Sequence, residues 1–71
     1  MSMTNFTTEE MIADLAACRE DIGICRMALL QGITAHIDGT SVAERIETNQ
    51  KIITAIEAEL SARDAKARES L

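Results

Sequence analysis

The chain has 71 residues, of which 46% are apolar but only one, Phe6, is aromatic, and it carries a formal net charge of −5. This charge argues against direct binding of nucleic acid, and no apolar run approaches the roughly 18 residues that span a bilayer. The absence of proline and the small number of glycines are typical of long helices and argue against a strand-rich fold. A chain this short buries little surface, so we expect self-association to extend its core.

Residues 1–6 are expected to form a disordered N-terminus. Met1 and Ser2 precede a second methionine, Met3, which is typical of an expression remnant or an alternative start. The segment has neither the basic start nor the apolar stretch of a signal peptide, so we expect a cytoplasmic location.

A first helix is predicted from about residue 8 to residue 37. Thr7 and Glu10 form the Ser/Thr-x-x-Glu capping box that marks a helix start. Beyond it, spacings of four and three alternate in the heptad pattern of packed helices. These seam positions are Met11, Leu15, Cys18, Ile22, Cys25, Leu29, Gly32 and His36.

A turn is predicted at residues 38–40, and a second helix, introduced by a capping box of Ser41 and Glu44, at about residues 41–68. Antiparallel pairing about Gly39 would place Leu30 beside Asn49. A competing interpretation makes residues 32–42 a short β-hairpin around the favoured Asp-Gly turn. The second helix continues the heptad at Val42, Ile46, Asn49, Ile53, Ile56, Leu60 and Ala67, with Arg63 between the last two.

The predicted fold is all-α: an antiparallel two-helix hairpin, resembling a coiled coil, that dimerises into a four-helix bundle. Residues 24–37 are apolar over more than one stripe, and one partner helix cannot cover both stripes. A second copy in a two-fold dimer is expected to cover the other stripe, although a foreign partner or a larger assembly would also do so. The predicted core and dimer residues are Leu15, Cys18, Ile22, Cys25, Leu29, Ile46, Asn49, Ile53, Ile56 and Leu60.

The predicted partner-binding residues are Arg26, Met27, Leu30 and Ile33. Arg26 is a lone cation in an apolar stretch, and arginine is enriched among the residues that dominate binding energy at interfaces. It could equally pair within the chain, with Glu44 or Glu47. Asn49 is a polar residue at a seam position, where such residues often fix register or oligomeric state.

No catalytic, metal-binding or cofactor-binding site is expected, and hence no enzymatic activity. His36 is expected to cap carbonyl groups at the end of the first helix, and Cys18 and Cys25 to be small buried side chains in a reducing compartment. Most acidic residues of the first helix are expected on its outer side, either as a solvated face or as a complement to a basic surface such as a DNA-binding domain. These residues are Glu9, Glu10, Asp14, Glu20 and Asp21.

A compact acidic hairpin counted from Met3, without a catalytic motif, resembles the small anti-host proteins of temperate phages, in particular those of the quorum-sensing anti-activator type. The resemblance covers the whole chain in length and predicted architecture and involves no short motif. It implies an inhibitor in the host cytoplasm that binds the DNA-binding domain of a LuxR-type transcription activator and a type IV pilus assembly ATPase. The alternatives are a phage assembly or oligomerisation adaptor and a small-molecule sponge.

Overall fold

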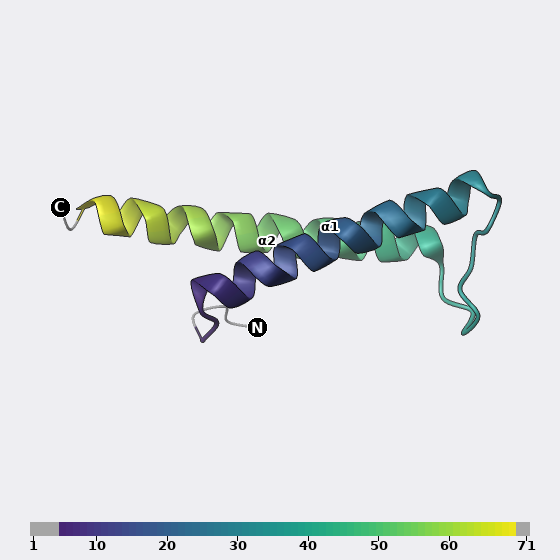
Figure 1. Ribbon diagram of the computed structural model, residues 1–71, viewed down its shortest axis with the longest axis horizontal. Coiled ribbons are helices and arrows are strands. Elements are labelled where there is room, and N and C mark those ends of the chain that lie inside the picture. Colours follow the sequence, from purple (N-terminus) through teal and green to yellow (C-terminus); the bar gives the residue numbers. More distant parts are fainter. Residues whose placement is uncertain (1–4, 70–71) are drawn as a thin grey trace.

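The computed structural model describes residues 5–69, which form two long helices that run in opposite directions and pack along much of their length (Figure 1). Helix α1 spans Thr8–Leu30, and helix α2 spans Val42–Glu69. The fold is therefore an all-helical hairpin, with no strand in the part of the chain described. The predicted N-terminal disorder falls in part on residues 1–4, which lie outside the described residues.

Helix α1 begins where its capping box places it. The Thr7 hydroxyl accepts a hydrogen bond from the Glu10 backbone N–H at 3.1 Å, and the Glu10 carboxylate accepts one from the Thr7 N–H at 3.2 Å. Thr7 itself is extended, with φ −72° and ψ 159°. The reciprocal bonds satisfy two backbone donors that the first turn leaves without a helical partner.

Helix α1 ends at Leu30, so the prediction that it continues to about residue 37 is wrong. Gly32 has a φ of +81°, in the left-handed region that glycine adopts without steric cost. The Ile33 N–H donates to the Ala28 carbonyl at 2.9 Å, and the Gly32 N–H donates to the Leu29 carbonyl at 3.0 Å. This Schellman motif closes the helix, although the heptad spacing continues through Gly32 in the sequence.

The connection between the helices contains a tight turn at His36–Gly39. The Gly39 N–H donates to the His36 carbonyl at 2.9 Å, and the His36 N–H donates to the Thr40 carbonyl at 2.8 Å. Gly39 has a φ of +86°, as expected for a three-residue hairpin loop that ends in a left-handed residue. The Asp38 carboxylate accepts bonds from the Thr40 N–H at 3.0 Å and from its hydroxyl at 2.7 Å, and these bonds lower the pKa of Asp38.

The two sides of this turn meet in a single antiparallel bridge between Ala35 and Ser41. The Val42 N–H donates to the Thr34 carbonyl at 3.1 Å on the same ladder. The competing β-hairpin interpretation is thus right about the location, but the pairing is one bridge long and forms no strand. The turn also has three loop residues, where the Asp-Gly pattern predicts two.

Helix α2 starts directly after the bridge, with the Ser41 hydroxyl accepting a bond from the Glu44 N–H at 3.3 Å. Ion pairs one turn apart run along the helix and give it modest support. They join Lys51 to Glu47 at 3.7 Å, Arg63 to Glu59 at 3.0 Å and Arg68 to Asp64 at 3.2 Å.

The core is a narrow seam between the two helices. Leu29 does not belong to it, because its side chain is 37% exposed where the chain leaves α1. The buried apolar side chains among residues 5–69 are Met11, Ile22, Cys25, Val42 and Ile56. Half-buried side chains flank them, namely Leu15, Cys18, Ile46, Asn49, Ile53 and Leu60.

The two helices pair in a different register from the predicted one. The Asn49 amide donates to the Asp21 carboxylate at 2.6 Å, whereas a bend at Gly39 would place Asn49 beside Leu30. At the other end of the seam, the Arg63 guanidinium donates to the Thr8 hydroxyl at 3.2 Å. Because α1 ends early, residues 31–41 form the connection. Each residue of α2 therefore lies beside a residue of α1 that is more than two helical turns nearer the N-terminus of α1 than predicted.

Candidate protein-interaction site

A polar cluster ties the two helices together near the loop. The Arg45 guanidinium donates to both carboxylate oxygens of Asp21, at 2.6 and 3.0 Å, and the Asn49 amide adds a third bond. The hydrogen bond from Arg45, with a further contribution from Asn49, lowers the pKa of Asp21 and outweighs its partial burial. We call these three residues the Asp21 clasp.

The clasp corrects the predicted position of Asp21, which faces α2 and is not part of the outer acidic side of α1. The seam residue Asn49 has a half-buried polar partner, Asp21, in the clasp, and its role in fixing register stays a prediction. Bidentate pairing of a guanidinium with a carboxylate is directional as well as charged, so the clasp favours one alignment of α1 against α2.

His36 lies in the connection, so the prediction that it caps the end of the first helix is wrong. Its Nε2 atom is buried without a hydrogen-bond partner among the described residues. The side chain borders an open cavity of about 350 Å³ between the connection and the helices, together with Asp21, Cys25 and Arg45. No serine or cysteine side chain is hydrogen-bonded to His36 within residues 5–69.

The two cysteines are free thiols, Cys25 buried and Cys18 half-buried. Burial raises the pKa of the Cys18 thiol, and the negative charges of Asp14 and Asp21 raise it further. The protonated form is thereby favoured, and a protonated thiol is a poor nucleophile.

An exposed stripe of apolar residues runs along a side of α1 that is not buried against α2. We call it the outer face, and it consists of Ile12, Ala16, Gly23, Met27 and Leu30, of which Met27 is 58% and Leu30 82% exposed. A groove of about 600 Å³ lies around Gly23 and Met27. A Cβ atom added at Gly23 would have no neighbour within 4 Å, so nothing in this chain requires a glycine there.

A second exposed apolar surface lies at the loop end of the hairpin. It comprises Ile33, which is 48% exposed, and Ile37, which is fully exposed at the tip of the turn. Ile24 is also exposed beside the outer face. Single exposed apolar residues are common, but a run of large ones over one end of a small protein is typical of an interaction site.

Arg26 is exposed at the edge of the outer face. Within residues 5–69 it forms no hydrogen bond or ion pair, and Glu47, one of its two predicted internal partners, pairs with Lys51. The predicted internal pairing is therefore absent. All four predicted partner-binding residues, Arg26, Met27, Leu30 and Ile33, are exposed near one end of the hairpin.

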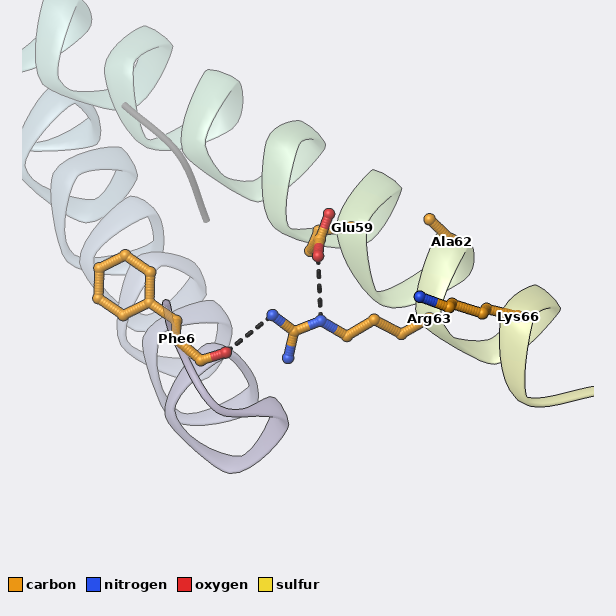
Figure 2. Close-up of a pocket in the computed structure, with 5 residues that line it drawn as sticks. All are labelled: Phe6, Glu59, Ala62, Arg63 and Lys66. Atoms are coloured by element: carbon orange, nitrogen blue, oxygen red, sulfur yellow. Dashed lines mark hydrogen bonds and ion pairs between the residues drawn. The ribbon is translucent and has the colours of Figure 1, made fainter. Parts of the chain in front are cut away.

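The opposite end of the hairpin is held by Arg63, the arginine that interrupts the predicted heptad. Figure 2 shows its guanidinium between α1 and α2, donating to the Phe6 carbonyl at 2.8 Å and pairing with Glu59 at 3.0 Å. An open hollow of about 340 Å³ lies beside it, bordered also by Lys66. Because the polar atoms of Arg63 bond within the chain, this end fits a structural role better than a binding role.

Neither described helix is long and apolar enough to cross a membrane. Among residues 5–69, no group of three or more His, Cys, Asp or Glu side chains is placed to hold a metal ion. No family model, curated protein or solved structure matches the chain.

Proposed function

We propose that this protein is a non-enzymatic inhibitor that acts by binding other proteins: it pairs with a second copy of itself as a four-helix bundle and covers a regulatory protein of a bacterial host. The observation that carries this proposal is the exposure of large apolar side chains, above all Met27, Leu30 and Ile37. Burying such side chains against another molecule contributes about 25 cal/mol for each Å² removed from water.

The exposed apolar surface divides into two parts with different roles. The outer face of α1 is long and straight and fits a second helix, so we assign Arg26, Met27 and Leu30 to self-association. The loop end is short, and Ile33 and Ile37 border the open cavity beside His36, so we assign these two residues to the host protein. Each surface is thus assigned to one binding partner.

The charge of the chain favours a basic partner. Each copy carries −5, so a dimer carries −10, twice that value. Opposite charge accelerates association with a positively charged surface, and the effect weakens as salt is added. A DNA-binding domain has such a surface, and the resemblance to phage anti-activators points to that of a LuxR-type quorum-sensing activator. A pilus assembly ATPase is a further target in the same proposal.

The test is whether the purified protein prevents a LuxR-type DNA-binding domain from binding its operator in a gel-shift titration. We expect the native chain to release the DNA, and the double variant Ile33→Asp, Ile37→Asp to need at least about tenfold more protein. Lys51→Asp is the matched control, because it adds an acidic residue to an exposed position on α2. Failure of the native chain to release DNA, or equal potency of the loop-end variant, would overturn this target.

A second candidate is an assembly adaptor. In Figure 1 the C-terminal part of α2 projects beyond the N-terminal end of α1, which leaves a stretch of helix free to pack in a larger array. Light scattering distinguishes the two: a discrete dimer supports the inhibitor, whereas a mass that keeps rising with concentration supports the adaptor.

A further inference from the structure

Polar and charged side chains line the two edges of the outer face of α1. Arg19 and Arg26 lie along one edge and Glu20 and Gln31 along the other, because successive residues of a helix are about 100° apart. All four are exposed, and Glu20 and Gln31 also border the groove at Gly23. The outer face is thus flanked by a basic edge and by an edge rich in hydrogen-bond acceptors.

This asymmetry distinguishes the two ways in which a second copy can pair α1 with α1. A two-fold axis parallel to the helix places each edge opposite the other edge of the second copy. A two-fold axis perpendicular to the helix places like edges together, so that Arg19 and Arg26 face one another. Like charges that face each other across an interface are destabilising, and opposite charges set the orientation of paired helices.

We propose that two copies pack their α1 helices side by side in parallel through the outer face, with Arg19 and Arg26 of each copy facing Glu20 and Gln31 of the other. The orientation rests on the proposed self-association and adds to it. At equal height along the parallel pair, Arg19 lies next to Glu20 of the second copy. Arg26 lies about 7.5 Å along the helix axis from Gln31 of the second copy, a distance that its long side chain can cover.

Gly23 gives this arrangement a point of close approach. A glycine inside a helix costs about 1 kcal/mol relative to alanine, and within this chain no neighbouring atom explains it. A glycine in the middle of the outer face lets a second backbone come nearer than any larger residue would. The exposed side chains of Met27 and Leu30 then pack against the second copy on the loop side of that point.

The parallel orientation also has a consequence for the host-binding surface. Both loop ends lie at the same end of the dimer, so Ile33 and Ile37 of one copy lie beside those of the other. Each loop end alone offers two isoleucines, whereas the pair offers one continuous apolar surface. The proposed host-binding site is therefore complete only in the dimer.

Cysteine cross-linking tests the orientation directly. Ala16→Cys and Leu30→Cys place a thiol on the outer face at two exposed positions, about 21 Å apart along α1. In the parallel dimer each position lies next to its own counterpart, so each variant alone forms a disulfide-linked dimer on mild oxidation. Thr48→Cys on the exposed side of α2 is the control and stays uncross-linked. The native chain also stays uncross-linked, because Cys25 is buried and the half-buried Cys18 does not lie on the outer face.

The alternative outcomes are distinct. A disulfide that forms only when the Ala16→Cys and Leu30→Cys chains are mixed shows an antiparallel pair, which overturns the orientation and leaves the proposed self-association intact. A native chain that stays monomeric overturns both. A dimer in which none of these thiols react shows that another surface holds the copies together, which also overturns the proposal.

A charge test gives results of opposite sign for the two orientations. Replacing Arg19 and Arg26 by Gln removes attraction from a parallel dimer but repulsion from an antiparallel one. We expect the dimer dissociation constant to rise by roughly threefold to tenfold. The control Lys51→Gln, Arg68→Gln changes the net charge equally at exposed sites on α2. A tighter dimer for the arginine variant, relative to this control, would contradict the parallel arrangement.

Discussion

The inner and outer faces of α1 are both apolar, but one chain covers only the inner face. Ile22 and Cys25 are buried against α2, whereas Met27 and Leu30, on the same stretch of helix, are 58% and 82% exposed. A helix that is apolar on two sides needs neighbours on both, and a two-helix hairpin supplies one neighbour. The uncovered outer face is the basis of the proposed self-association.

The largest difference in the free energy of unfolding is expected between alanine substitutions of apolar side chains on the two faces. Ile56→Ala removes a buried side chain from the seam, which should lower the free energy of unfolding by about 3 kcal/mol. Leu30→Ala removes an exposed side chain, which should change the stability of the monomer by less than about 0.5 kcal/mol. Urea denaturation at a protein concentration low enough to keep the chain monomeric measures both. Equal losses would show that the outer face is covered within the chain.

Alanine substitutions at Gly32, which closes α1, and at Gly23, within α1, are expected to change the stability of the monomer in opposite directions. Gly32→Ala forces a side chain into the left-handed region and should cost roughly 1 to 2 kcal/mol. Gly23→Ala lies in open space on the helix and should stabilise the monomer by about 1 kcal/mol, while weakening the dimer by holding the helices apart. Thermal unfolding and sedimentation separate the two effects. A tighter dimer for Gly23→Ala would contradict close approach at this residue.

Breaking the Asp21 clasp should lower the free energy of unfolding by a smaller amount that depends on pH. Asp21→Asn weakens the bidentate bond from Arg45, so we expect a loss of about 1 kcal/mol at neutral pH. Folding lowers the pKa of Asp21 below its ordinary value of 3.8, so its contribution is complete above that pH and is lost as the pH falls through the lowered pKa.

Urea titrations from pH 7 to pH 3 measure this effect. The native chain should have a higher free energy of unfolding than Asp21→Asn at pH 7, and this difference should shrink as the Asp21 carboxylate becomes protonated. Glu57→Gln, a substitution at an exposed position of α2, serves as the control for general charge effects. A difference between native and Asp21→Asn chains that does not change with pH would indicate that shape, and not charge, determines the effect.

Much of the hairpin follows from local patterns in the sequence. The capping box at Thr7 and Glu10 places the start of α1, and the heptad spacing predicts two helices that pack against each other. Both signals are local, because capping bonds join residues three apart and apolar spacing reflects one helix at a time.

The end of α1 and the pairing register are less accessible from the sequence. Gly32 fits the heptad spacing as a small seam residue, but its positive φ closes the helix, and spacing alone does not separate these roles. The position of the connection determines the pairing register of the two helices. Because the predicted end of α1 is wrong, the predicted neighbour of Asn49 is wrong as well. The contact between Asp21 and α2 was predictable from the sequence, because Arg45 and Asn49 lie one helical turn apart and can both donate to one carboxylate.

The proposed function requires a second copy that covers the outer face of α1. Sedimentation equilibrium of the native chain over a wide range of concentrations measures whether this second copy binds. We predict a single species of twice the 7.7 kDa chain mass that dissociates on dilution, and a shift of this equilibrium toward the monomer in Leu30→Asp. A chain that stays at 7.7 kDa while remaining folded at high concentration would contradict the proposed self-association.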